Sequence, residues 1–139
     1  MTLESYCEED TRTLAFITSK EARKGDIFTL DGDLGAGKTV FAKGFAEGLL
    51  INEPVTSPTF NIVKEYKGGR IPLYHFDVYR IEDPDEMQAI GYEEYFYGDG
   101  VCLIEWSEQI EELIPENAIR IKISRVPEKG DDYRLIEMD

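Results

Sequence analysis

Residues 32–39 read Gly32-Asp33-Leu34-Gly35-Ala36-Gly37-Lys38-Thr39 and are the most informative segment of this chain. This segment fits Gly-x-x-x-x-Gly-Lys-[Ser/Thr], the phosphate-binding P-loop. Its glycines adopt backbone conformations that other residues avoid, so several N–H groups can converge on the oxygens of a polyphosphate. The spacing predicts that Lys38 reaches the β and γ phosphates and that the Thr39 hydroxyl binds Mg²⁺. The motif therefore predicts a nucleoside triphosphate site.

The flanking residues favour the same interpretation. The apolar run Ile27–Leu30 is typical of a buried strand, and apolar residues recur at helical spacing from Lys38 to about Leu50. Strand, glycine loop and helix thus follow in the order that the motif requires. A glycine-rich turn without a ligand is the alternative, but such a turn has no need for a lysine and a threonine directly after its last glycine.

Composition limits the class of protein. The 139 residues, 42% of them hydrophobic, predict one globular domain that spans residues 1–139. The 29 acidic and 15 basic side chains sum to a formal charge of −14. A surface this acidic repels a phosphate backbone, so direct binding of nucleic acid is not expected. Binding of a nucleotide then depends on local groups, namely the loop amides, Lys38 and Mg²⁺.

The chain has no features of a membrane, secreted or metal-cluster protein. Its first residues contain no basic stretch followed by an apolar one, and no run of 18 apolar residues occurs. Two cysteines, Cys7 and Cys102, are too few for a disulfide framework. We therefore expect a cytoplasmic protein that does not contact a membrane.

The remaining patterns predict an α/β domain. A helix is expected over residues 5–24, and the paired glycines of 67–70 between two β-favouring runs predict a hairpin. Further elements are expected as a helix from Asp83 to Gly91, another helical turn over 92–97, a buried strand over 101–104, a short acidic helix over 107–113, and strands over 118–124 and 133–138. The prediction is a three-layer P-loop domain whose mixed central sheet is parallel around the P-loop and antiparallel at its edges.

Carboxylates at strand ends are the candidates for holding Mg²⁺. Asp77 ends one apolar run, and Glu105 ends Val101–Ile104, which is the more typical setting. His75 is the single histidine, and we expect it to be structural or to face a partner. The segment Val55–Phe60 is a loop with exposed hydroxyls, either a switch that senses the γ-phosphate or a plain turn. Glu8 to Thr11 is typical of a solvated helix start.

Four motifs occur in an order that resembles one family. They are the P-loop, Ser57-Pro58-Thr59-Phe60, His75-Phe76-Asp77-Val78-Tyr79-Arg80 and Glu105-Trp106. From about Cys7 onward the chain resembles the TsaE family, formerly called YjeE, the small bacterial ATPases of tRNA threonylcarbamoyladenosine biosynthesis. The resemblance implies a cytoplasmic protein that binds and hydrolyses ATP with Mg²⁺. It also implies a role in installing threonylcarbamoyl on adenosine 37 of tRNAs that read codons beginning with A, through the TsaD and TsaB proteins, with tRNA contacted only through that complex.

The same resemblance assigns roles to residues. It puts the phosphates on Gly32–Thr39 and the metal on Thr39 and Glu105. It implies nucleotide contact near Glu8, Thr11 and Trp106. For Glu8 to Thr11 this is a functional role that the local residue pattern does not indicate. The catalytic roles fall to Lys38, to Asp77 near the γ-phosphate and to Thr59 as the switch.

Three activities fit these residues. The favoured one is an ATPase that is slow alone and is completed by a partner, because no arginine is evident that would stabilise the transferring phosphate. The second is a small-molecule kinase, which needs an acceptor pocket and usually an arginine-bearing lid, but the arginines are scattered and no lid-like insertion is visible. The third is an assembly factor for which the nucleotide is only a structural ligand. A GTPase is disfavoured because the chain has no Asn-Lys-x-Asp motif.

Overall fold

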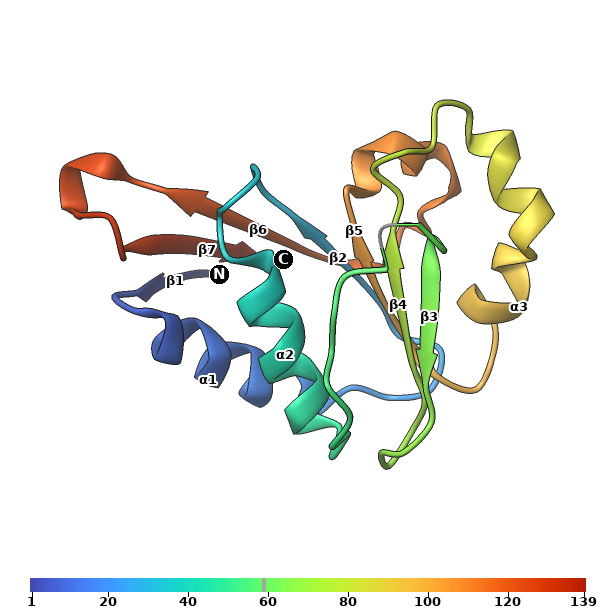
Figure 1. The fold of residues 1–139 in the computed structure, drawn as a ribbon, viewed down its shortest axis with the longest axis horizontal. Helices are drawn as coiled ribbons and strands as arrows, with labels where there is room; N and C mark the ends of the chain where they lie inside the picture. Colours follow the sequence, from blue (N-terminus) through green and yellow to red (C-terminus); the bar gives the residue numbers. More distant parts are fainter. Residues whose placement is uncertain (59) are drawn as a thin grey trace.

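A seven-stranded sheet organises residues 1–58 and 60–139, which are the residues described by the computed structural model (Figure 1). Its strands lie in the order β1-β7-β6-β2-β5-β4-β3. Their bounds are Thr2–Ser5 (β1), Ile27–Asp31 (β2), Val63–Tyr66 (β3), Leu73–Asp77 (β4), Val101–Glu105 (β5), Ile119–Arg125 (β6) and Arg134–Met138 (β7).

The centre of the sheet is parallel and its edges are antiparallel, as predicted. Strand β2 pairs in parallel with both β5 and β6, and β5 pairs in parallel with β4. Antiparallel pairs add β3 to β4, β7 to β6 and β1 to β7. The hairpin expected around residues 67–70 is the β3–β4 pair. Because parallel strands end at the same edge, the carboxyl ends of β2, β4 and β5 meet there.

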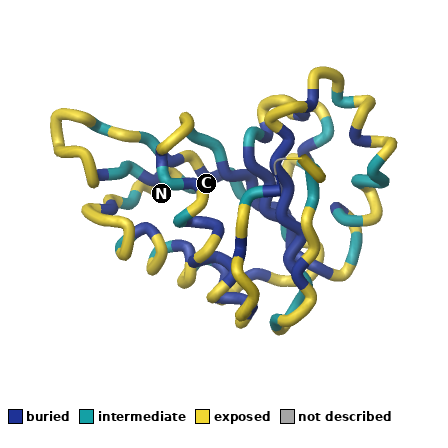
Figure 2. The backbone as a smooth tube through the Cα atoms, viewed as in Figure 1, coloured by how far each residue is buried: buried dark blue, intermediate teal, exposed yellow. Residues whose placement is uncertain are grey.

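Helices cover both faces of the sheet, which gives three layers (Figure 1). Helices α1 (Glu8–Lys20) and α2 (Lys38–Gly48) pack on one face, where Phe28, Leu30 and Leu103 join their core. The opposite core contains Ile27 and Ile104 and is covered by the 3₁₀ helices η1 (Pro84–Ile90) and η2 (Ser107–Leu113) and by α3 (Tyr92–Phe96). A third 3₁₀ turn, η3 (Pro127–Lys129), lies between β6 and β7. Figure 2 shows buried residues concentrated in the central strands between these layers.

The N-terminus corrects one prediction. Instead of a helix from residue 5, Thr2–Ser5 forms β1 against β7, and α1 begins at Glu8. The pairing continues to the ends of the chain, where the Met138 N–H donates to the Met1 carbonyl at 2.8 Å. The hydrogen bonds of β1 go to a strand more than 120 residues away, so no local pattern marks it.

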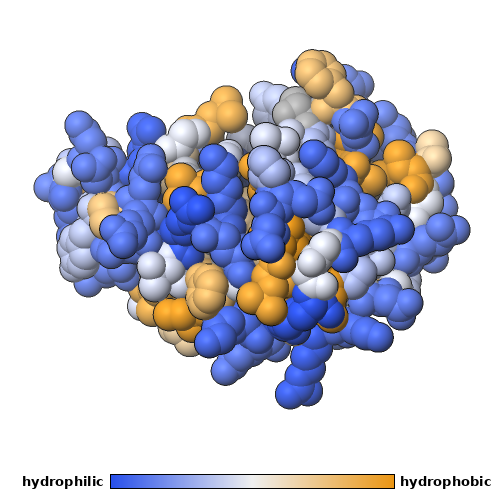
Figure 3. Space-filling view, turned by 60° about the horizontal axis from the view of Figure 1, so that its bottom comes forward, coloured by the Kyte–Doolittle hydropathy of each residue, from blue (hydrophilic) through white to orange (hydrophobic). Residues whose placement is uncertain are grey.

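Hydrophilic residues predominate on one face of the molecule, and hydrophobic residues gather there in a few groups (Figure 3). Residues 1–58 and 60–139 include no helix with the length and apolar character needed to cross a bilayer.

Two glycines on α2 let helix α1 pack closely against it. A Cβ atom added to Gly44 would overlap the backbone carbonyl of Arg12, and one added to Gly48 would lie 2.5 Å from the carbonyl oxygen of Phe16. The backbone of α1 therefore occupies the space that side chains at these two positions would need.

We predict that Gly44→Ala destabilises the protein. An alanine in a helix interior normally adds up to about 1 kcal/mol of stability relative to glycine. At Gly44 the added methyl group overpacks against Arg12, so the substitution should destabilise the protein instead. The free energy of unfolding should fall by about 2 kcal/mol. Chemical denaturation measures the change.

The matched control is Gly68→Ala in the β3–β4 turn. An added Cβ there meets its nearest atom, Glu53 Oε1, at an ordinary 3.6 Å. This variant should stay within about 0.5 kcal/mol of the parent. Equal stabilities of the two variants would contradict the packing argument.

Candidate nucleotide-binding site

A cavity of about 480 Å³ opens where β2, β4 and β5 end. The P-loop and the start of α2 form one part of the lining, and the residues that end or follow β4 and β5, together with Ser57, form the other. The lining residues are Leu34, Gly35, Gly37, Lys38, Thr39, Val40, Ser57, Asp77, Tyr79, Arg80, Glu105 and Trp106. The motifs that the sequence showed separately therefore meet in one place.

The P-loop glycines are required by its backbone. Gly35 and Gly37 have φ angles of +79° and +107°, in the left-handed region that disfavours side chains. Gly32 is needed for space, because an added Cβ would lie 2.5 Å from the carbonyl oxygen of Ile123. Gly37 is the N-cap of α2, so the positive end of that helix faces the cavity.

Lys38 lies at the bottom of the cavity with only 6% of its surface exposed. Its ammonium donates to the Gly32 carbonyl at 2.5 Å and lies 3.5 Å from the centre of the Trp106 ring. Burial lowers the pKa of Lys38, and the nearby carboxylates of Glu105 and Asp77 oppose that shift. The Lys38 ammonium is thus held by the Trp106 ring and the Gly32 carbonyl. A bound phosphate would be its partner at the same place.

Trp106 occupies a strained backbone conformation. Its φ of +62° is left-handed, which for a residue of this kind costs of the order of 1 kcal/mol. In this conformation the indole contacts both the Lys38 ammonium and the Tyr79 ring, whose centre lies 4.8 Å from its own. The ring therefore forms a wall of the cavity directly beside the P-loop lysine.

The two predicted carboxylates are both buried and have different partners. Asp77 accepts hydrogen bonds from the Ser57 hydroxyl at 2.8 Å and from the Tyr79 N–H at 3.0 Å. Glu105 lies 2.6 Å from His75 Nε2, and these two residues are 3% and 1% exposed. His75 Nδ1 finds no hydrogen-bond partner in the part of the chain that the structure describes, so the contact of Nε2 with Glu105 is the one that holds the ring there. His75 is thus structural, holding Glu105 in place.

These residues fit a magnesium ion. The hydroxyl of Thr39 and the carboxylates of Asp77 and Glu105 line the same cavity, and hard oxygen ligands are those that Mg²⁺ prefers. Within residues 1–58 and 60–139, no group of three or more His, Cys, Asp or Glu side chains is placed to hold a metal ion by itself. In nucleotide sites, phosphate and water oxygens complete the coordination of Mg²⁺.

Several predicted contact residues lie outside this cavity. Gly32, Asp33 and Ala36 line a depression on the other side of the P-loop. Glu8 lines a further depression, which shares Val40 with the cavity. The Thr11 side chain is buried, with its hydroxyl 2.6 Å from that of Ser5. Contact of Glu8 or Thr11 with a nucleotide remains a prediction. Thr59 lies outside the described residues.

The structure adds residues that the sequence did not single out. Ser57 orients Asp77, while Tyr79 and Arg80 line the cavity directly after it. Arg80 lies over the Phe60 ring, 4.6 Å from its centre, and is a cation at the cavity in addition to Lys38. All three residues belong to motifs visible in the sequence, but nothing in the spacing indicated which member of each motif faces the site.

Asp31 supports the back of the P-loop. It ends β2, and its carboxylate accepts from the Ser107 N–H at 2.7 Å and from the Ser107 hydroxyl at 2.5 Å. Burial raises the pKa of Asp31 to about 6, with the Ser107 bonds opposing the shift and the carboxylate of Glu108 adding to it. This pair ties the end of β2 to the start of η2.

A parallel sheet with a glycine loop between β2 and α2, and with carboxylates at the ends of the neighbouring strands, defines a P-loop NTPase fold. Comparison with known families agrees. The model for "Threonylcarbamoyl adenosine biosynthesis protein TsaE" matches residues 5–134. The chain therefore belongs to the TsaE family, whose name records a part in threonylcarbamoyladenosine biosynthesis.

Individual relatives cover most of the chain. The TsaE protein of Bacillus subtilis is 55% identical over 128 residues, which are 92% of this chain and 78% of that protein. The Treponema pallidum TsaE is 41% identical over 86% of this chain and 87% of its own length. A crystal structure of Bacillus subtilis YdiB superposes with a TM-score of 0.84 at 47% identity, covering 98% of this chain and 82% of that one.

We predict that Asp31→Asn stabilises the protein at neutral pH. The folded chain holds the Asp31 proton more tightly than the unfolded chain, so the stability that Asp31 contributes is greatest near pH 4 and falls as the pH rises through about 6. Asparagine avoids the cost of ionising a half-buried carboxyl group. At pH 8 the variant should gain roughly 1–2 kcal/mol after allowance for solvent screening.

Urea denaturation between pH 4 and pH 8 checks this prediction. The difference between the variant and the parent should grow with pH and nearly vanish at pH 4. A difference that does not change with pH would contradict it.

Proposed function

We propose that this protein binds and hydrolyses ATP with Mg²⁺, and that it acts in the cytoplasm in the threonylcarbamoylation of adenosine 37 in tRNAs that read codons beginning with A. The observation that supports the chemistry is the single cavity shared by Lys38, Thr39, Asp77 and Glu105. The pathway is supported by membership of the TsaE family.

Phosphate binding follows from the loop geometry. In the bound state the ammonium of Lys38 exchanges its contact with the Gly32 carbonyl for phosphate oxygens. The first-turn amides of α2 donate to the same group, and the helix dipole favours its negative charge. These local donors have to overcome the repulsion from a chain that carries a formal charge of −14.

Hydrolysis requires a water molecule aligned with the γ-phosphate. Asp77 is suited to orienting it, because two hydrogen bonds fix its carboxylate at the cavity wall. The metal would be held by Thr39 and Glu105, the latter positioned by His75, and when bound it neutralises charge that develops on the phosphate oxygens. Lys38 and the loop amides stabilise the same charge.

The net charge and the family membership support a proposal about partners. We propose that the chain acts through the TsaD and TsaB proteins and meets tRNA only within that complex, since the net charge disfavours direct contact with a phosphate backbone. We expect slow turnover by the isolated protein, with the partner completing the site.

We predict that Lys38→Ala abolishes ATP binding at concentrations that saturate the parent. The variant removes the one ammonium in the loop and should weaken binding of Mg·ATP by about a hundredfold. Isothermal titration calorimetry measures this directly. Fluorescence of Trp106, the single tryptophan, provides a second readout because its ring lies 3.5 Å from the Lys38 ammonium.

Lys67→Ala is the control, since Lys67 is exposed in the β3–β4 turn and does not line the cavity. Hydrolysis by Lys38→Ala at the parental rate would contradict the proposal. A pull-down with TsaB and TsaD, with and without ATP, tests the part of the proposal that concerns partners.

We predict that Asp77→Asn separates binding from hydrolysis. Asparagine keeps an oxygen that accepts from Ser57 or Tyr79 but lacks the charge that orients water. The affinity for Mg·ATP should change by less than about threefold, while the hydrolysis rate should fall by about a hundredfold or more. Calorimetry and phosphate release measure the two quantities, and an equal loss of both would assign Asp77 to binding instead.

A further inference from the structure

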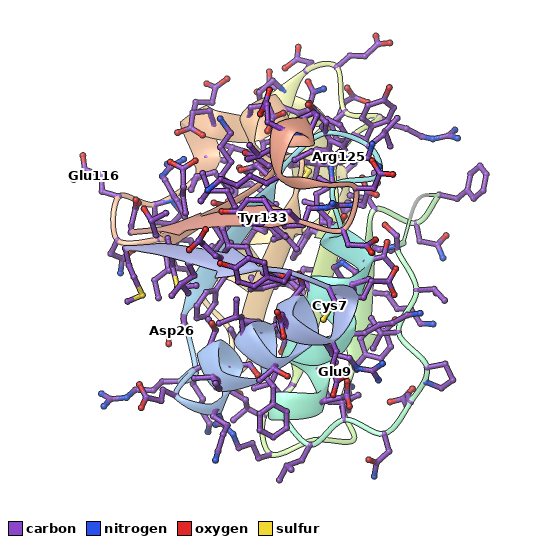
Figure 4. The ribbon with its side chains drawn as sticks, turned by 90° about the vertical axis from the view of Figure 1, so that its left-hand side faces the viewer. Cys7, Glu9, Asp26, Glu116, Arg125 and Tyr133 are labelled. Carbon is purple, nitrogen blue, oxygen red and sulfur yellow. The ribbon has the colours of Figure 1, made fainter. Side chains whose placement is uncertain are left out.

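Two arginines meet across the C-terminal hairpin. Arg125 ends β6, Arg134 begins β7, and the two are directly opposite in the antiparallel register. Figure 4, turned toward the left-hand side of Figure 1, labels Arg125 on this hairpin together with Tyr133, which precedes β7. Like charges placed opposite one another on paired strands destabilise a sheet. Their position therefore calls for a compensating interaction.

That interaction is not an ion pair. Within residues 1–58 and 60–139, the salt bridges shorter than 4.0 Å involve neither Arg125 nor Arg134. The chain has 29 acidic residues, so carboxylate partners are plentiful elsewhere. Both guanidinium groups are instead directed at the outer side of the P-loop.

Three hydrogen bonds make this contact. Arg125 Nη2 donates to the Gly35 carbonyl at 3.0 Å, and Arg134 donates to the same carbonyl through Nη2 at 3.4 Å. Arg134 Nε donates to the Ala36 carbonyl at 2.8 Å. The Arg134 guanidinium is itself held by the carbonyls of Asp131 and Tyr133, at 2.6 and 2.8 Å. The hairpin thus binds the middle of the loop through carbonyl groups.

Peptide geometry links these carbonyl contacts to the N–H groups of the loop. In a planar trans peptide the C=O and the following N–H point in opposite directions. Because the Ala36 carbonyl is bound to Arg134, the Gly37 N–H points away from the hairpin, and Gly37 lines the cavity. The Gly35 carbonyl is fixed in the same way, and the Ala36 N–H that follows closes the loop on the Asp33 carbonyl at 3.0 Å.

We propose that Arg125 and Arg134 are positioning residues that hold the P-loop in its phosphate-binding conformation from behind. This proposal rests on the proposed function. It adds a structural reason for the affinity of the P-loop for Mg·ATP. It also gives Gly35 a second role, since a Cβ there would lie 2.9 Å from Arg125 Nη2 and displace the guanidinium. Because contacts that favour one loop conformation act reciprocally, nucleotide binding should in turn order the hairpin.

The test compares Arg134→Ala, Arg134→Lys and Arg125→Ala for binding of Mg·ATP by calorimetry. Losing two hydrogen bonds from a charged donor should weaken binding by Arg134→Ala about tenfold. Arg125→Ala should lose less affinity for Mg·ATP, because Arg125 is exposed and makes only one of the three hydrogen bonds. In steady-state kinetics the loss should appear mainly in KM. The Lys variant should behave like the Ala variant, because an ammonium cannot reproduce the planar fork of Nε and Nη2.

Arg70→Ala is the matched control. Arg70 also donates two hydrogen bonds to backbone carbonyls, those of Ser19 and Lys20 at 2.7 and 2.9 Å, but it does not line the cavity. It should lower the melting temperature without changing the affinity for Mg·ATP. Hydrogen exchange provides a further readout, since nucleotide should slow exchange of amides 126–133 in the parent and not in Arg134→Ala.

The outcomes separate the two proposals. A parent chain that gives no heat with Mg·ATP overturns the proposed function and this inference together. If the parent binds and Arg134→Ala binds equally well, only the positioning role is overturned. Parental affinity in Arg134→Lys also overturns it, because charge alone would then explain the effect.

Discussion

The parallel pairing of β5 with β2 and β4 is the constraint on which the site depends. Its register sets Leu30 opposite Glu105 and Glu105 opposite Asp77, so the end of the P-loop strand and two carboxylates lie side by side. Side chains alternate between the faces of a strand, so a slip of one residue would turn Glu105 to the opposite core. The fully buried apolar runs of β2 and β5 on both faces prevent that slip, since each register error would misplace several apolar side chains at once.

The site concentrates features that are unfavourable for folding. A buried lysine, two buried carboxylates, a left-handed tryptophan and two left-handed glycines lie around one cavity. Real folds tolerate such local conflicts at functional sites when the remainder is consistent. Here the remainder consists of two apolar cores, one on each face of the sheet, which hold the strand ends in position.

Local patterns predicted much of the fold. The P-loop strand and helix, the β3–β4 hairpin and the helix after Asp83 depend on short-range spacing, capping and turn chemistry. Strand β1 was missed because its partner lies at the other end of the chain. The site residues were predicted one motif at a time, but Ser57, Tyr79 and Arg80 were not distinguished, because spacing does not indicate which side chain of a loop turns inward.

Local sequence was enough to predict the class of fold, the P-loop and the candidate carboxylates, because each depends on residues that are neighbours in the chain. The folded arrangement was needed to show that His75 holds Glu105, that Trp106 covers Lys38 and that Arg125 and Arg134 contact the back of the P-loop. Each of these contacts joins residues that lie 30 to 99 positions apart. Such contacts depend on strand order and register, which are properties of the folded chain and not of any local pattern.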